Sequence, residues 1–182
     1  TGSFSKNSYE LLSGFACFVF SNQNLFSPSL EEITRTLKLM DIKSIIEQAW
    51  ENRELLQEAS TQEAIRSIIA DLDMGKLRVA SPSENGEWIV NDWIKKAVIL
   101  YFPIQKMQTI EVGPFEFHDK MALKTNYAAQ GVRVVPHAVA RYGAYLASGV
   151  IMMPSYVNIG AYVDSGTMVD TWATVGSCAQ IG

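Results

Sequence analysis

Apolar residues recur with helical spacing between residues 41 and 72, in two separate stretches. The first apolar stripe consists of Ile42, Ile45, Ile46, Ala49, Trp50 and Leu56. The second consists of Ala64, Ile65, Ile68, Ile69 and Leu72. Such stripes are typical of amphipathic helices that bury one face. Ser60 and Glu63 have the spacing of a capping box, and Gly75 is placed to end the second helix, so we expect a helical hairpin.

The next stretch predicts short strands around a third helix. Strands are expected at 76–80 and 87–90, because the turn pair Asn85 and Gly86 lies between them. A helix is expected over 92–102, ending at Pro103, followed by extended segments at 108–112 and 115–117 and a polar connector through residue 130. Residues 40–130 therefore read as a small α+β domain. It shows no catalytic spacing, and a surface role explains His118 beside Asp119 better than catalysis does.

The period changes to six residues near the carboxyl end. In steps of six the chain carries Val139, Tyr145, Ile151, Val157, Val163, Val169, Val175 and Ile181. Four residues beyond each of the first seven stand Gly143, Gly149, Ser155, Ala161, Thr167, Ala173 and Ala179, all of them small or short. Two periodicities in one frame indicate a structural repeat. We expect triangular coils of three hexads, with the aliphatic residue inside and the small residue near a corner.

Residues 18 apart should then stack inside the coil. The expected stacks are Val139 with Val157 and Val175, Ile151 with Val169, and Val163 with Ile181. Gly160 and Gly166 fall where corners can require positive φ. The alternative, a β-sandwich, fits badly because its strands alternate with period two and its turns recur at longer, looser spacings. Gly182 is the second residue of a new hexad, so we expect this sequence to be the front part of a longer protein.

Composition and charge argue against several kinds of partner. The 182 residues carry a net charge of −4, which disfavours nucleic acid and anionic membranes. The longest apolar run, 11–20, is too short to cross a bilayer, which needs about twenty residues. The two cysteines, Cys17 and Cys178, lie far apart, which favours a reducing cytoplasm over a disulfide framework.

Residues 1–39 lack any sustained period, and the chain does not begin with Met. We expect this leader to lie outside the native domain, with Met40 as a plausible natural start. The alternative is that residues 11–20 form an element packed on the body of the domain.

Several segments resemble one enzyme family. They are 132–136 (VRVVP), 153–164 (MPSYVNIGAYVD) and 166–182 (GTMVDTWATVGSCAQIG), with weaker likeness at 77–80 and 93–98. Together they are similar to the tetrahydrodipicolinate N-succinyltransferases, a family of hexapeptide-repeat transferases, over about residues 41–182. The resemblance implies an α+β amino-terminal domain followed, over 131–182, by a left-handed parallel β-helix that is incomplete at the C-terminus. It also implies homotrimers with active sites between adjacent β-helices.

The implied reaction moves a succinyl group from succinyl-CoA to the amino group of open-chain tetrahydrodipicolinate, on the diaminopimelate route to lysine. Asp170 matches the family's carboxylate at the amine, and Arg133 matches its substrate-binding arginine. Each has a plainer interpretation. An acidic residue after the aliphatic position is ordinary in such coils, as Asp164 illustrates, and Arg133 could be a surface charge. Arg141 is a weaker candidate, and Trp172 either forms a pocket wall or lies at an outer surface.

The resemblance implies no permanent cofactor, with succinyl-CoA as co-substrate. A metal is disfavoured because no histidine lies at or beyond Val139, and His137 stands just before the coils. The family's second catalytic carboxylate and most of its coenzyme A groove are expected beyond Gly182, so this chain alone is expected to be inactive. Two other interpretations remain: a non-catalytic trimeric β-helix module, and the acetyl-transferring sibling enzyme.

Overall fold

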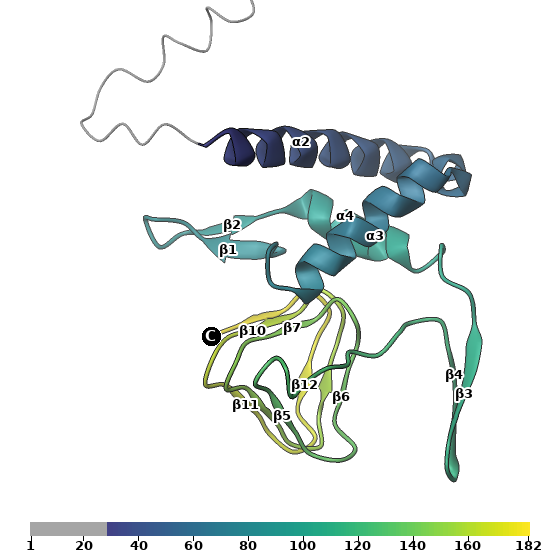
Figure 1. Cartoon of the computed structure of the whole chain (residues 1–182), viewed down its shortest axis with the longest axis vertical. Coiled ribbons are helices and arrows are strands. Elements are labelled where there is room, and N and C mark those ends of the chain that lie inside the picture. Colours follow the sequence, from purple (N-terminus) through teal and green to yellow (C-terminus); the bar gives the residue numbers. More distant parts are fainter. Residues whose placement is uncertain (1–28) are drawn as a thin grey trace, which may run out of the picture. The chain divides into compact units, whose positions relative to one another are not determined.

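The computed structural model describes residues 29–182 (Figure 1). The expected leader therefore lies largely outside the described residues, as does the apolar run 11–20. The chain divides into two units, residues 1–37 and 38–182. No helix within residues 29–182 is long and apolar enough to cross a membrane. The domain boundary expected at residue 39 stays a prediction.

The first described helix, α2 (Leu30–Glu51), begins well before Asp41, where the apolar period starts. Leu30, Ile33 and Leu37 are exposed. An exposed helical segment buries no stripe, so it leaves no periodic signal in the sequence, although its Leu, Glu and Lys residues favour helix. Helix α2 therefore begins within the segment 1–39, although that segment shows no sustained period in the sequence.

A short 3₁₀ helix, η1 (Arg53–Gln57), and the helix α3 (Ala59–Asp73) follow α2. The expected capping box is wrong. Glu58, not Ser60, is the N-cap residue of α3, and no side chain caps this end. Gly75 does end α3: its φ is +70° and its N–H donates to the Leu72 carbonyl at 3.0 Å. The helix α4 (Asp92–Tyr101) is as predicted.

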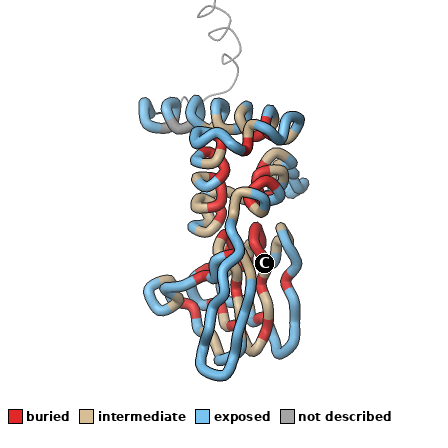
Figure 2. The backbone as a smooth tube through the Cα atoms, turned by 90° about the vertical axis from the view of Figure 1, so that its right-hand side faces the viewer, coloured by how far each residue is buried: buried red, intermediate tan, exposed pale blue. Residues whose placement is uncertain are grey.

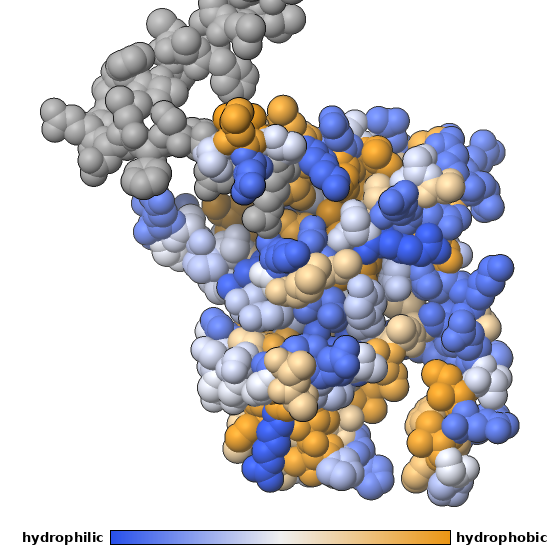
Figure 3. All heavy atoms as spheres, in the orientation of Figure 1, coloured by the Kyte–Doolittle hydropathy of each residue, from blue (hydrophilic) through white to orange (hydrophobic). Residues whose placement is uncertain are grey.

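Two antiparallel hairpins flank these helices. In the first, β1 (Ala80–Pro82) pairs with β2 (Trp88–Val90). The strand expected at 76–80 is wrong for most of its length, because the N–H groups of Lys76 and Leu77 both donate to the Asp71 carbonyl at the end of α3. In the second hairpin, β3 (Gln108–Val112) pairs with β4 (Phe115–Asp119), as expected. Exposed apolar side chains gather on this hairpin (Figure 3), among them Ile110 and Phe117, which oppose each other.

The carboxyl-terminal part consists of nine strands of two residues each. They are β5 (Arg133–Val134), β6 (Val139–Ala140), β7 (Tyr145–Leu146), β8 (Ile151–Met152), β9 (Tyr156–Val157), β10 (Tyr162–Val163), β11 (Met168–Val169), β12 (Thr174–Val175) and β13 (Gln180–Ile181). They form three parallel sheets, β13–β10–β7, β11–β8–β5 and β12–β9–β6. Parallel pairing between strands about one coil apart confirms the stacked coil and excludes the sandwich.

The predicted inward positions are right for the later strands. Val157, Val163, Val169 and Val175 are all buried, and Val175 pairs with Val157 as expected. Ile181 likewise pairs with Val163.

The predicted inward positions of the earlier strands are wrong by one residue. Val139, Tyr145 and Ile151 are only half-buried, whereas their neighbours Ala140, Leu146 and Met152 are buried. Accordingly Ala140, not Val139, pairs with Val157, and Met152, not Ile151, pairs with Val169.

Pro154 explains the change of phase. Coil corners carry residues of positive φ at six-residue intervals, at Gly143 and Gly149 and again at Gly160 and Gly166. The corner between Gly149 and Gly160 contains Pro154, whose ring holds φ near −65° and forbids the left-handed conformation. That corner is one residue shorter, so every inward position before it shifts by one. Gly143 and Gly149 lie at corners with positive φ, and the buried positions that follow these corners are Ala144 and Val150.

Buried residues form two clusters, one among the helices and one inside the coils (Figure 2). Ile159 of the coil belongs to the helical cluster. A buried ion pair also joins the two parts: Lys124 Nζ lies 2.9 Å from Asp73 Oδ1, and the same oxygen accepts the Gly143 N–H at 2.9 Å. The last turn of α3 is thereby attached both to the connector and to a coil corner.

Candidate functional site

Arg133 and Asp170 lie on the outer face of the same parallel sheet, β5–β8–β11. Arg133 stands in register with Ile151 and Met168, while the next residues, Val134, Met152 and Val169, point inward. Asp170 follows inward Val169, so strand alternation returns it to the outer face. Both side chains are exposed. The roles expected for Arg133 and Asp170 come from the family resemblance. Independently of that resemblance, the coil brings the two residues to one surface.

The two residues form no ion pair with each other in the described part of the chain. Their strands are separated by two strand spacings, which is about 10 Å, and Asp170 lies roughly 7 Å further along the strand direction. A guanidinium fork and a carboxylate at that separation can instead hold opposite parts of one elongated molecule. Within residues 29–182 neither residue takes part in an ion pair, so both charges are available.

Local bonding at Asp170 matches that at Asp164. Asp170 Oδ1 accepts the Thr171 N–H at 2.7 Å, and Asp164 Oδ1 accepts the Ser165 N–H at 2.7 Å. Each carboxylate thus has one oxygen fixed by the following backbone. The difference is location, since Asp164 follows β10, in the sheet β13–β10–β7. Asp164 is therefore a matched control for Asp170 that does not share the surface with Arg133.

Trp172 lies two residues beyond Asp170, at a coil corner. Its side chain is 84% exposed, and its φ of 61° is uncommon for a bulky residue. Its N–H donates to the Pro154 carbonyl at 2.7 Å, which holds the corner in this conformation. The corner therefore presents an exposed indole two residues beyond Asp170. This arrangement suits both expectations for Trp172, a pocket wall and an outer surface.

Arg141, the weaker arginine candidate, is engaged elsewhere. Its Nη2 lies 2.9 Å from Asp119 Oδ2 at the end of β4, and its Nη1 lies 3.5 Å from Asn158 Oδ1. Arg141 follows β6, which belongs to the sheet β12–β9–β6. The structure thus assigns Arg141 to the contact between the second hairpin and the coils, away from Arg133 and Asp170.

The remaining titratable candidates have structural surroundings. Thr109 Oγ1 and His118 Nδ1 lie 2.9 Å apart across the β3–β4 hairpin. The His137 ring meets Phe115 edge-on, with ring centroids 6.4 Å apart. Burial raises the pKa of the Cys178 thiol, which disfavours a reactive thiolate. Among the residues from 29 onward, no group of three His, Cys, Asp or Glu side chains is arranged to hold a metal ion.

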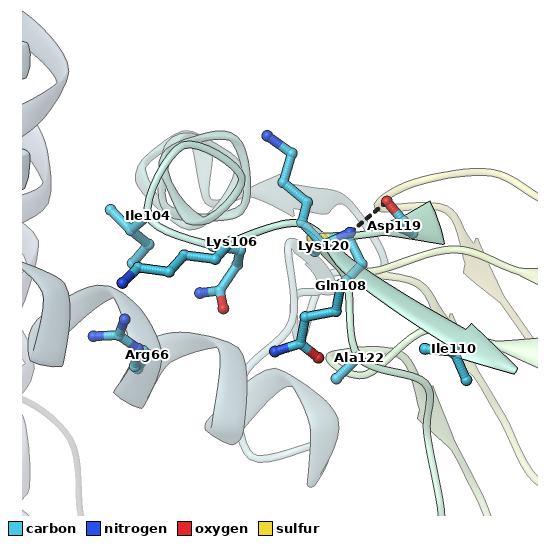
Figure 4. Close-up of a pocket in the computed structure, with 10 residues that line it drawn as sticks. Arg66, Ile104, Lys106, Gln108, Ile110, Asp119, Lys120 and Ala122 are labelled. Carbon is cyan, nitrogen blue, oxygen red and sulfur yellow. Dashed lines mark hydrogen bonds between the residues drawn. The ribbon is translucent and has the colours of Figure 1, made fainter. Parts of the chain in front are cut away.

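One cavity was missed by sequence reasoning. It has a volume of about 300 Å³ and is lined by residues of α3, of the turn after α4, and of the β3–β4 hairpin with the residues that follow it (Figure 4). No sequence pattern marks it, because its residues come from segments that only the fold brings together. The one local hint of the cavity is a polar turn after Pro103, which contains Gln105, Lys106 and Gln108.

The six-residue turns, the three parallel sheets and the helical domain before them define the class: a hexapeptide-repeat coil with an amino-terminal helical domain. Residues 41–104 match the amino-terminal domain model of tetrahydrodipicolinate N-succinyltransferase. The resemblance seen in the sequence is thereby confirmed, and the chain is homologous with the tetrahydrodipicolinate N-succinyltransferases.

Individual relatives agree. The chain is 49% identical over 151 residues to 2,3,4,5-tetrahydropyridine-2,6-dicarboxylate N-succinyltransferase of Variovorax paradoxus, covering 78% of this chain and 54% of the relative. It is 51% identical over 154 residues to the protein of the same name from Acinetobacter baylyi, covering 79% and 56%. It is 54% identical over 129 residues to the protein of the same name from Paracidovorax citrulli, covering 65% of this chain and 47% of the relative. The chain thus spans about half the length of the curated relatives it matches.

Proposed function

We propose that this protein is an acyltransferase that moves the succinyl group of succinyl-CoA to the amino group of tetrahydrodipicolinate, in its open-chain 2-amino-6-oxopimelate form. The observation that carries the proposal is the identity of about one residue in two with enzymes named for this reaction. The placement of Arg133 and Asp170 on one outer sheet face adds support, because the acceptor is an elongated dicarboxylate.

The chemistry assigns a task to each residue. Asp170 orients the acceptor amine and takes its proton, so that the nitrogen can attack the thioester carbonyl. A nitrogen–carbon bond forms, the carbon–sulfur bond breaks, and the thiolate of coenzyme A leaves and is protonated. Arg133 holds a carboxylate of the acceptor through paired N–H donors, a geometry that Lys cannot reproduce. No metal and no permanent cofactor enters these steps.

The proposal includes the left-handed course of the coils, a homotrimer and a cytoplasmic location. Support for an assembly comes from the sheet β5–β8–β11, whose outer face carries exposed Arg133, Met168 and Asp170. A neighbouring copy over this face would enclose the substrate and exclude water. The second catalytic carboxylate and most of the coenzyme A groove are expected on further coils.

One experiment separates the candidate functions. Purified protein extended to the length of the relatives is assayed with succinyl-CoA and with acetyl-CoA, against a tetrahydrodipicolinate analogue, by following thiol release. We expect turnover with succinyl-CoA to exceed that with acetyl-CoA, and no turnover by the 182-residue chain. Faster reaction with acetyl-CoA would favour the sibling enzyme, and a well-folded trimer without turnover on either donor would favour the assembly module.

A further inference from the structure

The cavity beside α3 has the size and composition of a small-molecule site. Its volume of about 300 Å³ lies at the lower end of the range for ligand pockets. All of its lining residues belong to the unit 38–182. It is separate from the outer face that carries Arg133 and Asp170, since none of its lining residues comes from the coils.

Positive charge dominates the cavity. Arg66, Lys106 and Lys120 line it, against one carboxylate, Asp119. That carboxylate is already satisfied: Oδ2 lies 2.9 Å from the Arg141 guanidinium, and Oδ1 accepts the Lys120 N–H at 2.8 Å. Figure 4 shows the Lys106 and Arg66 side chains reaching the same end of the cavity, while the Lys120 side chain points away from them. Two cations therefore share one end in a chain whose net charge is −4.

A buried donor lies at the same cavity without a partner. Gln105 Nε2 is buried and has no hydrogen-bond partner, although Gln105 is one of the lining residues. Leaving such a donor unpaired costs about 1–3 kcal/mol, so most buried donors in proteins are satisfied by protein, water or ligand. A rotation of the Gln105 amide toward the cavity would let an acceptor oxygen between Lys106 and Arg66 satisfy it.

Apart from Gln108, the rest of the lining is apolar. Ile104, Met121 and Ala122 contribute hydrocarbon surface, and Met121 is buried. A simple inorganic ion would leave this surface unused. A molecule that combines an acidic group with a short hydrocarbon portion would use both parts.

We propose that this cavity binds a short aliphatic carboxylate, with the carboxylate between Arg66, Lys106 and the Gln105 amide and the hydrocarbon part against Ile104 and Met121. Arg66 donates through N–H groups not used by Gln62, which accepts from Nη1 at 3.2 Å. The site is independent of the proposed transfer reaction and requires no residue of the coils.

The test uses the 182-residue chain and three probes: hexanoate, inorganic phosphate and hexylamine. Isothermal titration should give one saturable site for hexanoate, with a Kd on the order of 1 mM. Hexylamine should not bind, and phosphate should bind several-fold more weakly. The Gln105 side-chain amide resonance should shift on addition of hexanoate, a measurement that needs no variant.

Variants locate the site. Arg66→Gln combined with Lys106→Gln should raise the Kd for hexanoate about tenfold or more, since both charge-assisted bonds are lost. Lys43→Gln, which removes an exposed charge on α2, should leave the Kd unchanged. The proposal is overturned by no saturable binding up to 20-fold above the expected Kd, by phosphate binding as tightly as hexanoate, or by an unchanged Gln105 resonance.

Discussion

Met152 lies beside Val169 in the ladder of the sheet β11–β8–β5, seventeen residues earlier, whereas Val157 lies beside Val175, eighteen residues earlier. One coil is therefore a residue shorter than the next. The shorter turn contains Pro154, and the interior stays continuous because Met152 replaces Ile151 as the inward residue. A six-residue repeat can thus lose a residue at a corner without losing its core.

This change of phase predicts unequal effects of neighbouring substitutions. Met152→Ala should lower the free energy of unfolding by about 2–5 kcal/mol, because Met152 is fully buried and its removal leaves a cavity. Ile151→Ala, one residue earlier and half-buried, should cost about 1 kcal/mol or less. Urea unfolding of both variants measures the difference. An equal or larger loss for Ile151→Ala would contradict the observed register.

The buried ion pair between Lys124 and Asp73 predicts a large, specific loss of stability. Lys124→Met should cost about 3–5 kcal/mol, because Asp73 is left without its cation. Lys76→Met, at an exposed position, is the control and should cost little. Adding Asp73→Asn to Lys124→Met should recover part of the loss, since Asn retains the acceptor for the Gly143 N–H without the unpaired charge. Strict additivity of the two changes would argue against a coupled pair.

Burial of tyrosines predicts that stability falls at alkaline pH. Desolvation raises the pKa of Tyr127 and of Tyr101 above the ordinary value of 10.0. Above that value the unfolded chain releases its phenol protons first, so it binds fewer protons than the folded chain and stability declines as pH rises. The contribution is fully present below pH 10 and is lost as pH passes through the folded pKa values. Urea titrations on either side of pH 10 should show the decline, and Tyr127→Phe should reduce it.

The sequence was sufficient for the elements whose signal is local. Helix α4 lies between Asn91 and Pro103, and the hairpin of β3 and β4 is marked by Gly113 and Pro114. Apolarity alone could not show which residue of each early strand points inward, because both residues of each strand are apolar. The pairs are Val139 and Ala140, Tyr145 and Leu146, and Ile151 and Met152. Pro154 was the available clue, since it cannot adopt a left-handed corner.

The candidate site was predictable only in part. Asp170 and Arg133 were singled out through likeness to a family, and their roles remain predictions. Their common sheet face follows from coil geometry, which six-residue counting alone misplaces by one residue before Pro154. The engagement of Arg141 by Asp119 depends on a hairpin docking against the coils, a long-range contact that no local pattern encodes.

Replacing Arg133 tests the carboxylate contact in the protein extended to the relatives' length. Arg133→Lys keeps the charge but loses the paired donors, so KM for the amino acceptor should rise about tenfold or more. KM for succinyl-CoA should change far less. Steady-state kinetics with each substrate varied in turn separates the two, and equal losses for both substrates would indicate a folding defect instead.

The most direct measurement compares Asp170→Asn with Asp164→Asn in that same extended protein, with kcat and unfolding free energy determined on the same samples. The two carboxylates have the same backbone bond but lie on different sheets, and only Asp170 shares a face with Arg133. Asp170→Asn should lower kcat by about 100- to 10,000-fold, the usual effect of losing a general base, with little change in stability. Asp164→Asn should leave kcat close to normal. Near-normal turnover for Asp170→Asn, or equal losses for both variants, would contradict the assignment of the amine's proton to Asp170.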